Sequence, residues 1–211
     1  YNNKTQLDAW RKFASIVPVS DFREQKRVRM GGYGDLAAVS EAAAYADVTS
    51  PTDDVAKYSA SKRGGLEKIT LEMIKNDDVG AIRQIPVKLA RAAKRTLSKF
   101  AFNLIVSNPT LGDSKTLFHA DHGNLGSDAL SAASFTARRL AMMKQKEAGS
   151  NEVLSIPPAY LLVPPELEET AYNLFVRNTN NDPQYVQTVK PEIIPIWYAT
   201  DADDWYLAAD P

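Results

Sequence analysis

The chain contains no cysteine, and only two of its 211 residues are histidine. The absence of cysteine excludes disulfide bonds, thiolate zinc sites and cysteine nucleophiles together. It also fits a chain made in a reducing cytosol. Because the two histidines, His119 and His122, lie three positions apart, any imidazole chemistry is confined to one short segment.

An excess of charge of one sign is also lacking. The chain has 25 basic and 26 acidic residues and a net charge of -1, which excludes an overall basic nucleic-acid binder but not a locally basic surface. No apolar run reaches the roughly 18 residues of a membrane-spanning helix, and the start YNNKTQLDAW does not resemble a signal peptide. We therefore predict a soluble protein with no membrane partner. Because the chain begins at Tyr1 rather than Met, we expect a segment to precede it in the full gene product.

What stands out is a long helical pattern within the run from Lys57 to Asn108. Thr70 is the predicted N-cap, and Pro86 must kink or restart the helix because proline lacks a backbone donor. The segment from Pro86 to Ser107 would span about 33 Å at 1.5 Å per residue. Apolar side chains recur along it every three or four residues, at Leu89, Ala93, Leu97, Phe100 and Leu104. A helix of this length in so small a chain must be central to the architecture.

The segment before this helix reads as extended. Residues 36–48 and 55–69 flank a turn-rich stretch from Ser50 to Asp54, which predicts a long two-stranded excursion. It has few apolar residues and many charges, so it cannot bury a core of its own. Such a projecting hairpin needs a partner surface.

The remainder of the chain mixes helices with strands, which predicts an α+β fold. The predicted helices are 4–16, a helix capped by Ser134 and running to Glu147, and one that starts with Pro165 in its first turn and ends near Arg177. The predicted strands are 160–163, 185–189, 192–200 and 205–208.

The sequence His-Ala-Asp-His at 119–122 invites a metal-site or general-base hypothesis. On an extended segment, His119 and Asp121 would share one side while His122 faces away. A catalytic zinc site would need a third ligand from elsewhere, and a structural site a fourth. The alternative is a loop in which these side chains bond backbone groups or a neighbouring molecule, and this is the interpretation we adopt. We expect no metal and no cofactor.

Six basic residues and no acidic one lie between Arg83 and Lys99. Three interpretations remain open: a solvated helix surface, pairing with acids of an adjacent subunit, and contact with phosphate. The glycines of GGYG and KRGG lack the strand and helix context of a phosphate loop, and there is no GxSxG motif to support a hydrolase triad. Four of the bases fall on one helical face: Lys88, Arg91, Arg95 and Lys99.

Taken in order, several segments resemble the major capsid proteins of tailed bacteriophages, in particular the Mu-like major head subunit and its prophage relatives. The resemblance covers roughly the whole chain. The segments are SDF, GGYGDL, KRGGLEKITLEMIKNDDVGAI, ARAAKRTL, NP, LFHADHGNLG, ALS, LLVPPELEETA and WYLAADP. ITLEMIKNDD, LFHADHGN and LLVPPELE are specific as a combination, although each alone is weak.

The resemblance implies the Hong Kong 97-like capsid fold, with a long spine helix and peripheral and axial domains. Residues 1–35 would be an N-terminal arm, 36–70 the projecting hairpin, 71–129 the peripheral domain with its loop at 109–127, 130–200 the axial domain, and 201–211 a return to the peripheral domain. Family members usually continue into further strands after a WYLAADP-like stretch, so we expect this chain to be truncated at Pro211. Some capsids of this fold crosslink lysine to asparagine, but we do not transfer that chemistry to Lys57 or Lys62.

The function that this implies is structural rather than enzymatic: a major head protein that self-assembles into the pentamers and hexamers of an icosahedral shell enclosing DNA. The implied partners are copies of itself, with a scaffold or prohead protease during assembly and packaged DNA bound non-specifically. The implied location is the virion capsid, and the bacterial host cytoplasm during assembly. The alternatives are a metal-dependent hydrolase using His119, Asp121 and His122, and a DNA-binding module using the basic helix face. The expected intersubunit residues are Lys62, Arg63, Glu67, His119, Asp121 and His122.

Overall fold

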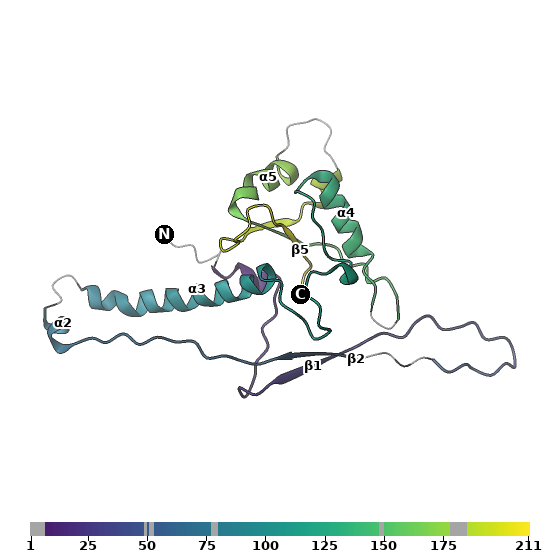
Figure 1. Ribbon diagram of the computed structural model, residues 1–211, viewed down its shortest axis with the longest axis horizontal. Coiled ribbons are helices and arrows are strands. Elements are labelled where there is room, and N and C mark those ends of the chain that lie inside the picture. Colours follow the sequence, from purple (N-terminus) through teal and green to yellow (C-terminus); the bar gives the residue numbers. More distant parts are fainter. Residues whose placement is uncertain (1–6, 49, 51–52, 77–79, 148–149, 178–184) are drawn as a thin grey trace.

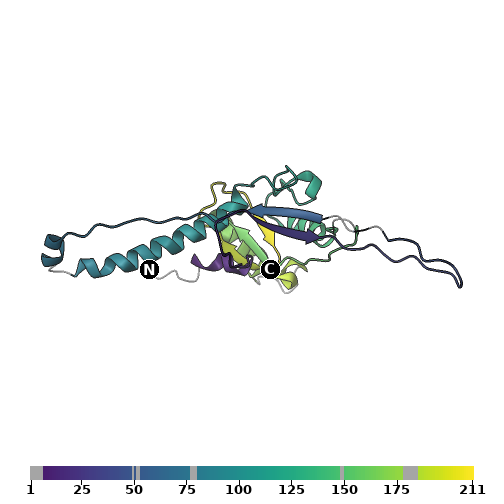
Figure 2. The same cartoon turned by 90° about the horizontal axis from the view of Figure 1, so that it is seen from below.

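The computed structural model describes residues 7–48, 50, 53–76, 80–147, 150–177 and 185–211. A compact body carries two extensions that point in opposite directions (Figure 1). One extension is a long loop, and the other is the free end of a long helix. Viewed from below, the molecule is narrow along its whole length (Figure 2).

The body is built on a three-stranded sheet. The central strand β3 (Tyr160–Val163) pairs in parallel with β4 (Glu192–Pro195) and antiparallel with β5 (Tyr206–Ala208). All four residues of β3 are apolar or aromatic, as expected for a central strand that is covered on both faces. The predicted strand 160–163 is therefore confirmed, and 205–208 is confirmed at 206–208, whereas the strand predicted at 192–200 ends at Pro195.

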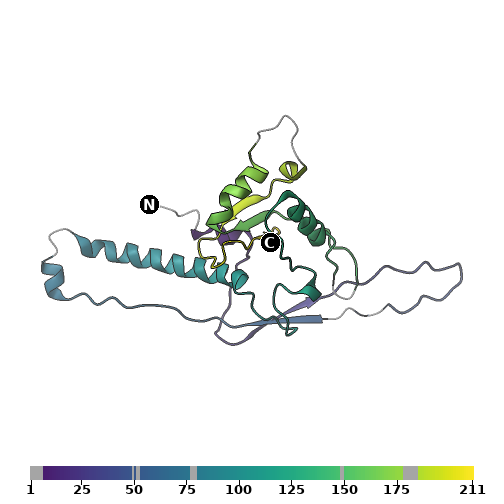
Figure 3. The ribbon, with the colours of Figure 1, turned by 45° about the horizontal axis from the view of Figure 1, so that its top comes forward.

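Two hydrophobic clusters cover the two faces of this sheet. On one face, α4 (Ala132–Met143) and α5 (Pro165–Phe175) pack through Phe135 and Phe175, whose rings meet edge-on at 4.7 Å. On the other face lie the end of α3 (Ile85–Val106) and the 3₁₀ helix η1 (Ala9–Lys12). Figure 3 shows the sheet between these two layers. The second cluster is formed by Trp10, Phe102, Leu162, Ile194 and Ile196.

The long helical pattern begins and breaks where the sequence predicts. Thr70 caps α2 (Leu71–Lys75) by accepting a hydrogen bond from the backbone N–H of Met73 at 3.2 Å. A 3₁₀ turn, η2 (Ala81–Gln84), then leads into α3, which has Pro86 in its first turn, where the missing N–H costs little. Helix α2 ends at its C-cap, Asn76, and residues 77–79 lie outside the described part of the chain.

The projecting hairpin is paired differently from our prediction. Strand β1 (Gln25–Met30) pairs antiparallel with β2 (Asp53–Tyr58). Residues 31–48 are a loop with no strand, and they turn back near Ser40, whose carbonyl accepts the N–H of Ala43 at 3.0 Å. The predicted pairing of 36–48 with 55–69 is wrong, because the alanine-rich outward stretch has low strand propensity. Pro51 and Thr52 of the predicted turn lie outside the described residues.

Two further predictions in the body are wrong. Helix α4 starts one turn earlier than predicted, because Ser131 is its N-cap and forms a reciprocal capping box with Ser134. This brings Phe135 inside the helix and into the core. Residues 185–189, predicted as a strand, form the short helix α6 (Tyr185–Val189). Val186 of α6 is buried in the cluster around Phe135 and Phe175.

The observed mixture of helices with separate small sheets is an α+β architecture, as predicted. Among the described residues, no helix has both the length and the apolar content needed to cross a bilayer.

Candidate assembly surfaces

The apolar stripe of α3 faces solvent instead of the core. Leu97 and Leu104 are each 47% exposed, although both lie on a strongly amphipathic helix. The core side of α3 is the opposite one, where Ser98 and Phe102 are buried. An apolar helix face whose large side chains are almost half exposed is typical of a surface that binds a partner. The exposed members of this stripe, which we call the α3 stripe, are Leu89, Leu97, Phe100 and Leu104.

The predicted basic face of α3 lies partly against the protein's own body. The ammonium group of Lys99 sits 5.1 Å from the ring centre of Tyr198, a cation–π contact. Lys94, on the same helix, forms an ion pair with Asp8 at 3.1 Å. Lys88, Arg91 and Arg95 are exposed. The four predicted residues are thus on one helix, and Lys99 has an aromatic partner within the chain.

The segment that leads back from the hairpin to α2 contains the other predicted interface residues. Lys62 and Glu67 are exposed. Arg63 lies over the ring of Phe100, 5.3 Å from its centre, and so covers part of the α3 stripe. The structure therefore places Arg63 on α3 of the same chain and leaves Lys62 and Glu67 directed to solvent.

The projecting loop, residues 31–48, exposes large apolar side chains to solvent. Leu36 is 79% exposed and Tyr45 is 88% exposed. Its charged residues are Asp35, Glu41 and Asp47, and it contains no lysine or arginine. The loop leaves the body at Gly32, where an added Cβ would overlap the carboxylate of Glu147. Its composition, apolar and acidic, is the complement of the α3 surface.

The loop from Asn108 to Asn124 is held by two asparagine side chains, which hydrogen-bond to backbone groups that have no partner in a regular element. The side-chain amide of Asn108 accepts from the N–H of Phe118 at 2.7 Å and donates to its carbonyl at 3.2 Å. Asn124 donates to the carbonyl of Leu117 and accepts from the N–H of His119. A sequence pattern cannot specify these pairs, because they join residues five to ten positions apart through one particular loop path.

The two histidines approach each other, contrary to our prediction. Residues Ala120–His122 form a 3₁₀ turn, η3, in which His119 is the N-cap and its Nδ1 accepts the N–H of Asp121. The turn brings the two imidazole rings to 5.9 Å between centres. No group of three or more potential metal ligands is assembled within the described part of the chain. The predicted hydrogen bonding of these side chains within the loop is confirmed.

The imidazole of His122 is placed between two acceptors. Its Nε2 lies 2.7 Å from a carboxylate oxygen of Asp113, and its Nδ1 lies 3.2 Å from the carbonyl of Leu117. Only the doubly protonated ring donates to both. The bond to Asp113, followed by that to Leu117, raises the pKa of His122 above its ordinary value of 6.5, and His122 in turn lowers the pKa of Asp113 below 3.8.

This pairing predicts a pH window for the order of the loop. The stabilisation from His122 is complete below pH 6.5 and is lost as the pH rises through its raised pKa. The stabilisation from Asp113 is lost as the pH falls through its lowered pKa, below 3.8. We therefore expect amides around Phe118 to exchange faster at pH 8.5 than at pH 6, after correction for intrinsic rates. Asp113→Asn should remove most of this difference, and an unchanged difference in that variant would contradict the assignment.

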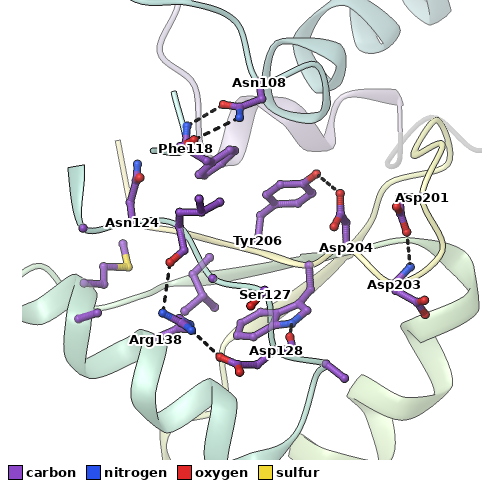
Figure 4. A pocket seen from close by; sticks show the side chains of 18 of the residues that line it. Asn108, Phe118, Asn124, Ser127, Asp128, Arg138, Asp201, Asp203, Asp204 and Tyr206 are labelled. Atoms are coloured by element: carbon purple, nitrogen blue, oxygen red, sulfur yellow. Dashed lines mark hydrogen bonds and ion pairs between the residues drawn. The ribbon is translucent and has the colours of Figure 1, made fainter. Parts of the chain in front are cut away.

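A pocket of about 730 Å³ lies between the loop 108–129, α4 and the segment 201–207 (Figure 4). Its polar groups bond mainly to one another: Arg138 pairs with Asp128, and Trp205 donates to the carbonyl of Asp128 at 2.9 Å. Burial and the neighbouring Asp204 raise the pKa of Tyr206 to about 12, so its phenol stays protonated and donates to Asp204. The sequence did not predict this pocket, although the segment DADDWY at 201–206 forms one of its walls.

Comparison with known proteins assigns the chain to a family. No curated protein and no solved structure matches it. The phage capsid protein family matches residues 54–211, from the second strand of the hairpin through α3 and the whole body. This match supports neither the hydrolase nor the DNA-binding alternative, and such families are structural rather than enzymatic. Because the match covers more than half of the chain, the protein belongs to the phage capsid protein family and is a component of a phage shell.

Proposed function

We propose that this chain is the major capsid subunit of a tailed phage or prophage, with the Hong Kong 97-like arrangement that the Mu-like resemblance implies. In this arrangement the projecting hairpin is β1, the loop 31–48 and β2, in place of the predicted 36–70, and the N-terminal arm ends before β1. Residues 71–129 are the peripheral domain and 130–200 the axial domain, with 201–211 returning to the periphery. Copies associate as pentamers and hexamers. One observation carries the proposal: the projecting loop and the α3 surface of one chain are complementary to each other.

The complementarity has an apolar and an ionic part. The exposed side chains of the loop, such as Leu36 and Tyr45, match the α3 stripe in character. The loop has acids without bases, whereas the chain from Gly80 to Ser107 has bases without acids. Opposite charge on two surfaces steers their encounter and fixes their register.

The placement of the two surfaces makes the contact heterologous. The loop and the start of α3 point to opposite ends of the molecule (Figure 1). A loop that binds α3 of the next copy therefore leaves its own α3 free for the copy behind. A head-to-tail contact of this kind closes into a ring when the rotation per copy fits. The geometry supports rings rather than isolated dimers.

The contact need not be strong on its own. Full burial of one leucine or phenylalanine side chain contributes about 1.5–3 kcal/mol, and ordering the loop opposes part of this gain. In a shell, each copy makes the contact twice, and linked contacts multiply the effective affinity. A monomer that is stable in solution and a shell that is stable once closed are both consistent with these magnitudes.

The remaining surfaces receive roles within the same proposal. The loop 109–127, with His119, Asp121 and His122, lies at the capsomer edge, and Lys62, Arg63 and Glu67 contact neighbouring subunits. Lys88, Arg91, Arg95 and Lys99 pair with acids or contact packaged DNA non-specifically. Assembly takes place in the host cytoplasm with a scaffold or prohead protease.

Electron microscopy of the full-length gene product, expressed alone and with its scaffold, tests the proposal. We expect closed shells, or rings of five and six subunits. A full-length product that remains monomeric at high concentration under both conditions would contradict it.

A further inference from the structure

The end of the molecule opposite the projecting loop is an uncovered segment. It consists of residues 66–75, with α2 at its tip (Figure 1). All five residues of α2 are exposed, and Leu66, just before it, is 83% exposed. Leu71 is exposed to 66%. Large apolar side chains are thus gathered at the part of the chain that lies far from the core.

A helix this short does not stabilise itself. Isolated helices of fewer than about 12 residues are marginal in water, and α2 has five residues, none of them buried. The cap from Thr70 satisfies one backbone donor but adds no apolar burial. A stable α2 therefore requires a surface that covers it.

The charges of this segment are balanced, unlike those of the other two surfaces. It carries two acids, Glu67 and Glu72, and two bases, Lys68 and Lys75. None of the four forms an ion pair with another residue that the structure describes. In an isologous contact the same patch meets itself across a two-fold axis, so its acids must face its bases. The purely acidic projecting loop and the purely basic α3 surface cannot meet themselves in this way.

We propose that this distal patch, formed by Leu66, Glu67, Lys68, Leu71, Glu72 and Lys75, is an isologous contact with a second copy of the chain. The inference rests on the proposed function. The head-to-tail contact between loop and α3 produces only rings or open filaments, so a closed shell needs a second, different contact that joins rings. The distal patch supplies it, because it is uncovered, self-complementary in charge and remote from the projecting loop.

Two charge variants of the full-length product test this contact. Lys68→Glu with Lys75→Glu makes the patch wholly acidic, and Glu67→Lys with Glu72→Lys makes it wholly basic. Each variant alone should form rings, seen by sedimentation and negative-stain microscopy, but its shell yield should fall at least tenfold. An equal mixture of the two variants should restore shells, because each acidic patch then meets a basic one.

The outcomes separate this inference from the proposed function. Shells at normal yield from either variant alone, or no recovery on mixing, would overturn the isologous contact. Unmodified protein that forms neither rings nor shells would overturn the proposed function and the inference with it. As a control for net charge, Lys144→Glu with Lys146→Glu changes two exposed bases outside the patch. This control should assemble normally. If its shell yield fell as well, net charge would explain the loss of shells in the patch variants, and the isologous contact would be contradicted.

Discussion

Replacing Leu97 and Leu104 with aspartate is expected to abolish ring and shell formation while leaving the monomer folded. Neither side chain belongs to the core clusters, and both are about half exposed, so the monomer loses little burial. In the assembly, the same change removes two apolar contacts and places two carboxylates opposite the acidic projecting loop. Unpaired charge in a closed contact is strongly unfavourable.

The measurement is sedimentation of the full-length variant beside a matched control. Leu140 on α4 is 48% exposed, nearly the same as the two α3 residues, but it lies outside the α3 stripe. Leu140→Asp should therefore assemble far better than the α3 variant. Thermal unfolding and circular dichroism should show that all three proteins are folded. Normal shells from Leu97→Asp with Leu104→Asp would remove α3 from the assembly contact.

Replacing Phe135 with alanine is expected to destabilise the body by about 3–5 kcal/mol, the range for large aromatic residues in cores. Phe135 is fully buried, and its ring meets that of Phe175 edge-on. The change removes this ring contact and leaves a cavity beneath α4, α5 and the sheet. Urea unfolding of the purified monomer, followed by far-ultraviolet circular dichroism, measures the loss.

The matched control is Phe22→Ala, because Phe22 is the same residue type at 69% exposure. Its effect should stay within about 0.5 kcal/mol, the usual range for surface changes. A loss below about 1 kcal/mol for Phe135→Ala would mean that the body does not depend on this cluster.

The parts of the fold that could be predicted are those set by local chemistry. Thr70 as a cap and the prolines in the first turns of α3 and α5 act within a few residues of themselves. The central strand was recognisable because its four residues are all suited to burial on both faces. These features depend little on the rest of the molecule.

The parts that were missed depend on distant partners. The sequence of α6 alternates enough to suggest a strand, but the segment forms a helix that buries Val186 in the cluster around Phe135 and Phe175. The pairing of β1 with β2 joins residues across more than twenty positions. Whether an apolar helix stripe faces inward or outward also cannot be told from its own spacing, because periodicity reports that a face is apolar and not what covers it.

The candidate assembly surfaces were also predicted only in part. Of the residues named for intersubunit contact, four are exposed and the two histidines are half-buried. The predicted arrangement of the histidines was wrong because the loop turns where an extended path was assumed. Of the distal patch, Glu67 alone was among the predicted intersubunit residues, since a short helix with no buried residue leaves no periodic signal.

Helix α3 is attached to the body near one end, so a small rotation there moves its other end by a larger distance. Its buried side chains, within the described part of the chain, are Ser98 and Phe102 in its second half, while its first residues extend away from the body (Figure 1). From Ile85 to Phe102 the helix is about 25 Å long at 1.5 Å per residue, so a rotation of about 10° at the anchor moves the free end by about 4 Å. A small change in the packing around Phe102 would thus shift the position of α2 and the start of α3 relative to the body. In the proposed assembly, such a rotation lets one chain meet neighbouring copies at more than one angle.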